Sequence, residues 1–156
     1  MRSFKLSYAG QGDVDLLAEH RKQMWLDIHP EYKREVRATE NGARRWIGDQ
    51  LSKGNLIGLI VRTSDGEVVG SGCIWLREEQ PRPTDMRLAV PYLMSMYTLK
   101  RFRRKGVASL IVKGALKWCR ERKYDRIVLH ASKEGRSVYE GFAFEPSNEM
   151  RLKLQT

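Results

Sequence analysis

The chain has 156 residues, of which 41% are apolar and 9% aromatic, and this composition predicts a single globular domain over residues 1–156. The longest apolar run, residues 56–61, is too short to span a bilayer, and no continuous apolar segment marks a signal peptide, so we expect a cytoplasmic protein. The formal net charge of +10 favours an anionic partner: nucleic acid, a membrane surface or a phosphorylated cofactor.

The cysteines and the common catalytic motifs exclude several functions. Cys73 and Cys119 show neither CxxC spacing nor a neighbouring His/Cys cluster, so we expect reduced thiols, no disulfide framework and no metal site. The sequence also lacks the motifs GxxxxGK[ST], HExxH and GxSxG. Nothing therefore supports a Walker-type nucleotide site, a metalloprotease or a serine hydrolase.

The first third of the chain predicts one strand and two helices. Apolar residues alternate with polar ones over residues 4–8, as in a strand with one buried face. Asp13 is placed to cap a first helix, which Pro30 interrupts. Asn41 is placed to cap a second helix, and Gly54 stands where a left-handed residue ends a helix.

The middle of the chain predicts three strands and a long helix. Residues 56–62 and 68–76 are rich in β-formers and flank an Asp-Gly pair, which indicates a hairpin. Two prolines make residues 78–85 an irregular loop. Residues 92–99 predict a fourth strand, and residues 106–122 carry an apolar stripe at helical spacing.

The last part of the chain completes the predicted sheet. Residues 126–130 read as a fifth strand, residues 134–140 as a short helix, and Phe144 with residues 150–154 as terminal strand. The resulting order is β-α-α-β-β-β-α-β-α-β. This order predicts an α/β fold with a mixed sheet and helices on its faces.

Residues 97–108 carry the strongest chemical signal. Here a strand leads into a cationic turn, and small residues open a helix, so that free backbone N–H groups and the positive helix end point at one spot. Gly106 and Ala108 would let phosphate oxygens approach the backbone, which makes this turn a candidate pyrophosphate cradle. In the alternative interpretation, Gly106 caps the helix and the Arg/Lys run is only solvated.

Residues 103–108 also match the signature (Q/R)xxGx(G/A), and the chain resembles the GCN5-related N-acetyltransferase (GNAT) superfamily. The predicted element order is the order of that family, and the Tyr139-Glu140 pair with Phe144 is similar to its second sequence block. The resemblance implies splayed central strands with helices on both faces. It also implies acetyl-CoA as cosubstrate, with no metal, and direct transfer of the acetyl group to an amine acceptor.

The resemblance implies roles for particular residues. Tyr139 would protonate the leaving thiolate, because a phenol is protonated at neutral pH; the alternative is a core tyrosine. A backbone N–H near Met96 or Tyr97 would stabilise the developing oxyanion. The residues expected to bind the cofactor are Met96, Tyr97, Thr98, Arg103, Arg104, Lys105, Gly106, Val107, Ala108, Ser132 and Arg136.

Two features depart from the family pattern. The family's Gly-Phe pair falls on Ala143 and Phe144, with the glycine displaced, and the fourth strand has no carboxylate to act as general base. The base therefore stays open between an ordered water and Asp27, His29 and Glu31, which cluster at the junction that borders the acceptor site in this family. Trp25 would line that site.

Other functions remain as alternatives. A basic nucleic-acid-binding module would use the Arg/Lys turn on phosphates, although few aromatic residues accompany the turn, which makes nucleic acid an unfavoured partner. A catalytically idle relative would bind CoA as a sensor. We expect no membrane partner. The acceptor amine, the preferred acyl chain and homodimer formation stay open.

Overall fold

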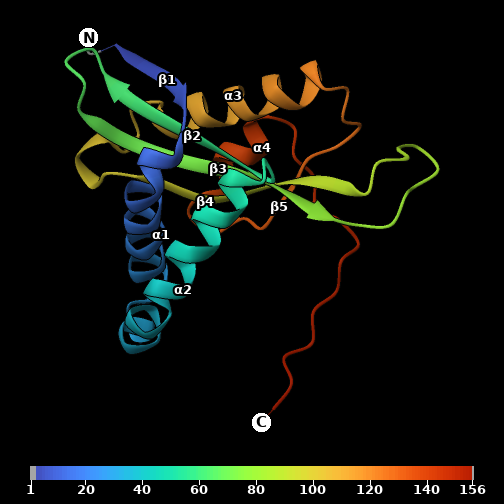
Figure 1. Ribbon diagram of the computed structural model, residues 1–156, viewed down its shortest axis with the longest axis horizontal. Coiled ribbons are helices and arrows are strands. Elements are labelled where there is room, and N and C mark those ends of the chain that lie inside the picture. Colours follow the sequence, from blue (N-terminus) through green and yellow to red (C-terminus); the bar gives the residue numbers. More distant parts are fainter. Residues whose placement is uncertain (1–2, 156) are drawn as a thin grey trace.

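The computed structural model describes residues 3–155, which form a mixed sheet with helices on both faces (Figure 1). In chain order the elements are β1 (Phe4–Tyr8), α1 (Val14–Ile28), α2 (Lys33–Ser52), β2 (Leu56–Thr63), β3 (Val68–Glu78), β4 (Ala89–Thr98), α3 (Val107–Glu121), β5 (Val128–Leu129) and α4 (Arg136–Gly141).

The strands follow one another across the sheet in the order β1-β2-β3-β4-β5. The first four pair as antiparallel neighbours, whereas β5 runs parallel to β4. An antiparallel pair can be joined by a tight hairpin, as β2 and β3 are, but the parallel β4–β5 pair needs a crossover, which α3 supplies. The predicted α/β fold with a mixed sheet is therefore confirmed.

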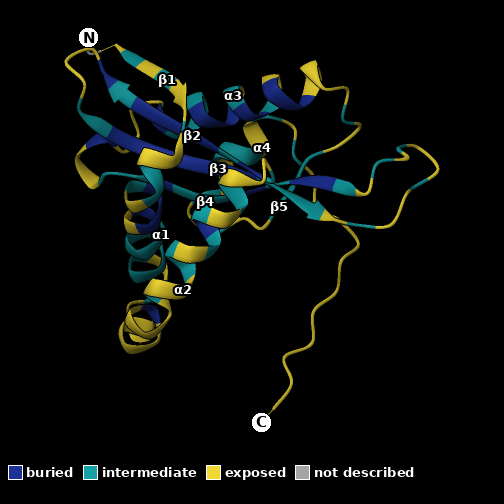
Figure 2. Cartoon of the chain, in the orientation of Figure 1, coloured by how far each residue is buried: buried dark blue, intermediate teal, exposed yellow. Residues whose placement is uncertain are grey.

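The two faces of the sheet bury separate cores. The apolar stripe of α3 packs on one face, while α1 and α2 cover the other, and the central strands between them are buried (Figure 2). The core below α3 includes Leu59, Val61, Val69, Ile74, Phe102, Val107 and Ile111. The core below α1 and α2 includes Leu17, Ala18, Ile47, Leu56, Ile60 and Cys73.

Strand β4 contains a bulge, and its C-terminal part is not paired with β5. The β3–β4 register shifts between the pairs Ser71–Tyr97 and Cys73–Met94, and Ser95 adopts a left-handed φ of 55° at this bulge. The parallel pairing with β5 stops at Leu93. Beyond the bulge, the edge of β4 that faced β5 is therefore open, and this is the splayed arrangement that the family resemblance implied.

The N-terminal half of α2 corrects one prediction. Asn41 does not cap a second helix, because α2 already begins at Lys33, directly after a 3-10 turn with Pro30 in its first position. Val36 and Ile47 are both buried on α2, so their packing carries the helix through the weak helix formers Asn41 and Gly42. Gly54 does have the expected left-handed conformation, with φ 72°.

The C-terminal segment corrects a second prediction. Residues 145–155 form neither helix nor strand, so the terminal strand expected at Phe144 and residues 150–154 is absent from the described chain. The segment runs away from the sheet and stays exposed (Figure 2). A strand needs a partner for its backbone groups, and β5 is itself only Val128–Leu129, shorter than the predicted residues 126–130.

Candidate functional site

The first turn of α3 forms an open site lined by backbone donors. Gly106 is the N-cap of α3 with φ 86°, and nothing lies within 4 Å of the position that a Cβ on it would occupy. The N–H groups of Val107, Ala108 and Ser109 have no backbone or side-chain acceptor among the described residues. With the positive helix end behind them, these groups can hold an anion such as a pyrophosphate.

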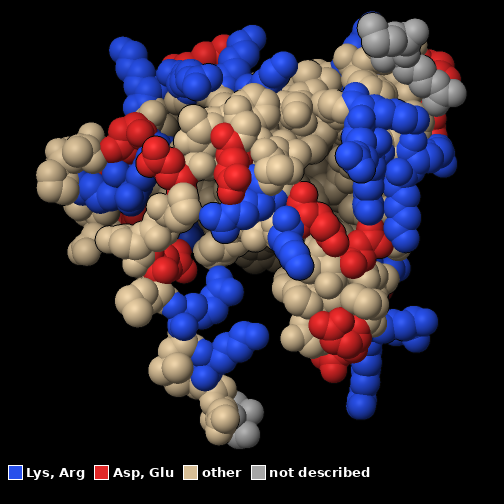
Figure 3. Space-filling view, turned by 180° about the vertical axis from the view of Figure 1, so that it is seen from behind, with Lys and Arg blue, Asp and Glu red and all other residues tan. Residues whose placement is uncertain are grey.

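The cationic residues of this turn do not all point to the open site. Arg103 donates to Asp27 Oδ2 at 2.5 Å and to the Thr98 carbonyl at 3.0 Å, and Arg101 forms an ion pair with Glu67. Arg104 makes neither an ion pair nor a hydrogen bond with any residue in the range 3–155. Lys and Arg side chains gather over the loop between β4 and α3, on the right of Figure 3. Arg104 is thus free to meet an anion, and Lys105, which donates only to the Arg101 carbonyl at 2.9 Å, has no ion pair among the described residues either.

The three strand residues expected at the cofactor lie on β4 just before this turn. Met96 packs on the core below α3, and the ring of Tyr97 lies 5.1 Å from that of His20. Burial raises the pKa of the Tyr97 phenol. Together with Thr98 they form the stretch of β4 whose outer edge is open, so this backbone is accessible beside the cradle.

The sequence analysis did not predict a buried polar pair that lies behind β4. His20 Nδ1 lies 2.7 Å from Ser71 Oγ, and both residues are buried. Burial lowers the pKa of His20, so its ring is neutral at neutral pH. The pair joins α1 to β3 across 51 positions of sequence, and no local motif could have indicated it.

Tyr139 lies on α4 with most of its ring covered. It packs against the core below α3, its ring centre lies 5.9 Å from that of Phe144, and burial raises the pKa of its phenol to about 12. No described residue forms a hydrogen bond with its hydroxyl. It lines a cavity of about 440 Å³ between β5, α4 and the C-terminal segment. The hydroxyl is therefore a protonated donor without a partner in residues 3–155.

The other two predicted cofactor residues near α4 already have partners. Ser132 Oγ accepts a hydrogen bond from the Gly135 N–H at 3.1 Å and so stabilises the turn that opens α4. Arg136 Nε donates to Glu140 Oε1 at 2.6 Å, one helical turn away. Arg136 also lines the cavity beside Tyr139.

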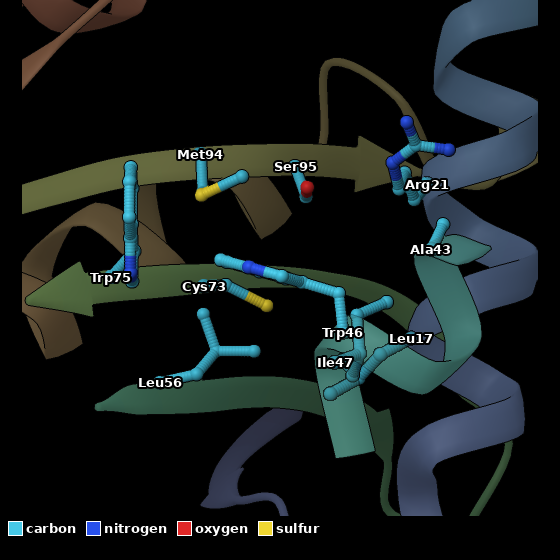
Figure 4. A pocket seen from close by; sticks show the side chains of 10 residues that line it. All are labelled: Leu17, Arg21, Ala43, Trp46, Ile47, Leu56, Cys73, Trp75, Met94 and Ser95. Carbon is cyan, nitrogen blue, oxygen red and sulfur yellow. The ribbon is translucent and has the colours of Figure 1, made fainter. Parts of the chain in front are cut away.

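A second cavity, of about 230 Å³, lies between α1, α2 and the other face of the sheet (Figure 4). Trp46 of α2 and Trp75 of β3 line it with their ring centres 5.5 Å apart. Arg21 lies at one end of it, and Ser95 brings the bulge of β4 into its wall (Figure 4). No sequence pattern indicated this cavity, because residues from separate elements form it.

The expected acceptor residues at the α1–α2 junction lie outside this cavity. His29 Nδ1 is 3.0 Å from Glu31 Oε1, and Asp27 binds Arg103. None of these side chains lines the cavity, and neither does Trp25. The hydrogen bond to its own backbone and the one from His29 lower the pKa of the Glu31 carboxyl. None of the three candidate bases therefore lines the cavity that reaches the bulge of β4.

The described residues contain neither a helix that could span a membrane nor a cluster of metal ligands. Over residues 3–155, no helix has the length and apolar character needed to cross a membrane. In the same part of the chain, no three His, Cys, Asp or Glu side chains are grouped so that they could hold a metal ion.

Comparison with known proteins adds a family match and structural neighbours. The model of the acetyltransferase (GNAT) family matches residues 18–144. No curated protein matches the sequence. A GCN5-related N-acetyltransferase from Ralstonia eutropha JMP134 is similar in structure, with a TM-score of 0.88, 20% identity and coverage of 97% of this chain and 99% of that chain.

Two further solved structures share the fold. A predicted acetyltransferase from Clostridium acetobutylicum, solved with acetyl-CoA, has a TM-score of 0.84 and 24% identity, and the match covers 98% of this chain and 96% of that one. A ribosomal-protein-alanine N-acetyltransferase from Brucella melitensis biovar Abortus 2308 has a TM-score of 0.71 and 17% identity, with 99% of both chains covered. At these identities the likeness concerns the fold.

Proposed function

The chain belongs to the acetyltransferase (GNAT) family, and from this premise we propose that it transfers an acetyl group from acetyl-CoA to an amine by direct attack. The observation that carries the proposal is the cradle at Gly106, which has free N–H groups and open space where a side chain would stand. A pyrophosphate is the part of CoA that such a helix start suits. The structural neighbour from Clostridium acetobutylicum, solved with acetyl-CoA, supports the same cosubstrate.

The residues around the cradle fit this cosubstrate. Arg104 has no partner in the described chain and can meet a phosphate, while the open edge of β4 after Leu93 offers backbone groups to an extended ligand. Bound there, acetyl-CoA would supply an acyl group activated as a thioester. Met96, Tyr97 and Thr98 would line the extended part of the ligand.

Each catalytic task is assigned to a group of this chain where one is suitable. A backbone N–H at Met96 or Tyr97 would stabilise the negative charge that develops on the acyl oxygen. Tyr139 would donate its proton to the departing sulfur, because a pKa of about 12 keeps the phenol protonated until the sulfur takes the proton. The amine loses its own proton to water, since no carboxylate of the described residues lines the cavity at the bulge. Water is thus the favoured base over Asp27, His29 and Glu31.

The proposal is tested by incubating the protein with acetyl-CoA and a panel of amines. Release of free thiol together with an acetylated product in mass spectrometry would support it. CoA binding without any product would instead indicate a sensor. If the protein does not bind CoA but binds a polynucleotide in a salt-dependent way, the result would indicate the nucleic-acid module.

We also propose a cytoplasmic location and a homodimer. The free Cys73 and Cys119, both buried, are compatible with a reducing compartment. Met150, Leu152 and Leu154 are 94%, 81% and 81% exposed, and they alternate along the C-terminal segment as they would in a strand. A second copy of the chain could cover them.

A further inference from the structure

The cavity below α1 and α2 has apolar walls and a single charge. Leu17, Trp46, Trp75 and Met94 are among the residues that line it, and Arg21 is the only charged residue of its described lining. Arg21 lies at one end and Trp75 at the other, with Trp46 between them (Figure 4). A ligand in this space would meet aromatic rings along its length and a cation at one end.

Arg21 has no counter-charge among the described residues. Among the described residues its guanidinium makes neither an ion pair nor a hydrogen bond, and its closest ring contact is with Trp25, at 6.0 Å from the centroid. Its neighbour on α1, Lys22, is instead 3.4 Å from both Glu19 and Glu40. Half-burial lowers the pKa of Arg21, which shows that part of its hydration is lost without compensation. A carboxylate on a ligand would provide that compensation.

The cavity also reaches the place where acetyl transfer is proposed. Ser95, the bulged residue of β4, forms part of its wall, and Met96 and Tyr97 follow it in the sequence. An amine that enters from the α1 and α2 side therefore arrives at the bulge. No Asp or Glu of the described chain lines the space, so a polycationic amine would find no partner there.

We propose that the acceptor is a free α-amino acid with an apolar or aromatic side chain. Its carboxylate pairs with Arg21, its side chain packs against Trp46 and Trp75, and its amino group faces the bulge at Ser95. The proposal rests on the acetyl transfer proposed above and names the substrate class of that reaction. The volume of about 230 Å³ lies below the roughly 300–1,000 Å³ of pockets for drug-sized ligands, which suits one amino acid.

The reaction at this site balances as follows. The amino nitrogen forms a bond to the acyl carbon while the bond from that carbon to sulfur breaks. The amino group, a cation at neutral pH, first loses one proton through water to solvent. The sulfur takes a proton from Tyr139, and the second proton that leaves the nitrogen as the C–N bond forms passes through water and restores the phenol. The products are the N-acetyl amino acid and the free thiol of CoA.

The experiment compares three acceptors that differ in charge. L-Phenylalanine carries the carboxylate, L-phenylalaninamide lacks it and resembles a peptide N-terminus, and spermidine carries only positive charge. Thiol release at saturating acetyl-CoA gives kcat and KM for each acceptor. We expect kcat/KM for L-phenylalanine to exceed that for the amide by about tenfold or more, as for one charge-assisted hydrogen bond. Equal or better use of the amide or of spermidine would overturn the proposal.

Two variants assign the effect to Arg21. Arg21→Gln should raise the KM for L-phenylalanine about tenfold and leave its kcat and the kinetics of the amide unchanged. Arg45→Gln removes an exposed cation from α2 that has no ion pair in the described chain. This variant should leave kcat and KM unchanged for both acceptors. If Arg21→Gln lowered kcat/KM equally for both acceptors, the result would contradict the assignment.

A binding measurement separates this inference from the reaction on which it rests. L-Phenylalanine should change the fluorescence of Trp46 and Trp75 without acetyl-CoA, and Arg21→Gln should weaken this binding about tenfold. If no amine is acetylated although L-phenylalanine binds through Arg21, the transferase function fails and the amino-acid site stands. If amines are acetylated but L-phenylalanine does not bind, the acceptor class is wrong and the transferase stands.

Discussion

Gly106 is a residue whose two properties can be separated by experiment. It has a left-handed backbone, which disfavours a side chain, and it faces the open space of the cradle. Gly66 in the β2–β3 hairpin has the same two features, with φ 93° and nothing within 4 Å of a Cβ, but it lies on a different loop. A comparison of the same substitution at Gly106 and at Gly66 therefore distinguishes backbone strain from obstruction of the phosphate site.

Gly106→Leu is expected to abolish CoA binding in a folded protein. The leucine side chain would fill the space from which N–H groups meet the phosphates, whereas Gly66→Leu should bind CoA as the parent does. Both variants should lose a similar free energy of unfolding, about 1–2 kcal/mol for a left-handed non-glycine residue. Isothermal titration with CoA and thermal unfolding measure the two effects. Unchanged CoA affinity in Gly106→Leu would exclude the cradle.

Tyr139→Phe tests the proposed general acid. The change removes one hydroxyl that no described residue binds, so it should leave the stability and the KM for acetyl-CoA unchanged while kcat falls by about 100-fold. Tyr8→Phe removes the same hydroxyl from an exposed tyrosine of β1 and should change nothing. Full turnover in Tyr139→Phe would assign the proton to water or another group, and a parallel loss of stability and activity would make Tyr139 a core residue.

The pKa of Tyr139 also predicts the alkaline side of the pH–rate profile. Its ordinary value is about 10 and burial raises it to about 12, so the acid form persists about two pH units further. Turnover should therefore not fall because of Tyr139 until the pH approaches that raised pKa. Steady-state rates measured from neutral pH upwards check this expectation. An alkaline fall centred near pH 9 that disappears in Tyr139→Phe would contradict it.

At the scale of elements, the loop between β4 and α3 divides its cations between two tasks. Arg103 bridges to Asp27 on α1, while Arg104 has no partner in the described chain. Arg104→Glu should weaken CoA binding about tenfold at low salt, and the difference should shrink near 1 M salt, where the screening length is about 3 Å. Lys113→Glu makes the same charge change on an exposed position of α3 and serves as control. Binding titrations at two salt concentrations measure the effect.

A comparison with an Arg103 variant adds a second measurement, the unfolding temperature. Arg103→Glu would place a carboxylate beside Asp27, so it should lower the unfolding temperature more than Arg104→Glu does. If neither substitution changes the dissociation constant at low salt, the cationic turn is only solvated, and the phosphates are held by backbone groups alone.

The elements that sequence predicted well are those with local signals. The Asp-Gly hairpin between β2 and β3 and the stripe of α3 were placed within about two residues of their observed bounds. The open helix start at Gly106 was predicted too, because Gly106 and the helix that it opens are neighbours in the chain. Asn41 misled the prediction of α2, since the burial of Val36 and Ile47 outweighs local propensity.

The features that sequence missed all depend on contacts between distant residues. Trp46 and Trp75 meet across α2 and β3, and Arg21 joins them from α1, so no spacing indicates their cavity. The same holds for the pairing of Arg103 with Asp27, which lies 76 positions away in the sequence. Apolar alternation predicted a terminal strand, but alternation specifies a strand only where a partner strand exists.

At the scale of the whole molecule, the C-terminal segment, residues 145–155, is not covered by the rest of the described chain. Met150, Leu152 and Leu154 are almost fully exposed, and they alternate with Arg151 and Lys153. Exposed apolar side chains grouped in this way mark an interaction surface. Backbone groups of this segment and of the short β5, at one edge of the sheet, remain open to a second copy.

We therefore expect a homodimer that depends on the apolar side chains of this segment. Replacing Met150, Leu152 and Leu154 together by Ser should shift the sedimenting species from about twice 18.1 kDa to the monomer mass. Replacing Arg151 and Lys153 by Ser changes the same segment on its other face and should keep the dimer, because charge there does not bury apolar area. CoA binding should survive in both variants, since the cradle lies on α3. A parent protein that sediments as a monomer at all concentrations would contradict the dimer, and a dimer that survives the triple substitution would place its interface elsewhere.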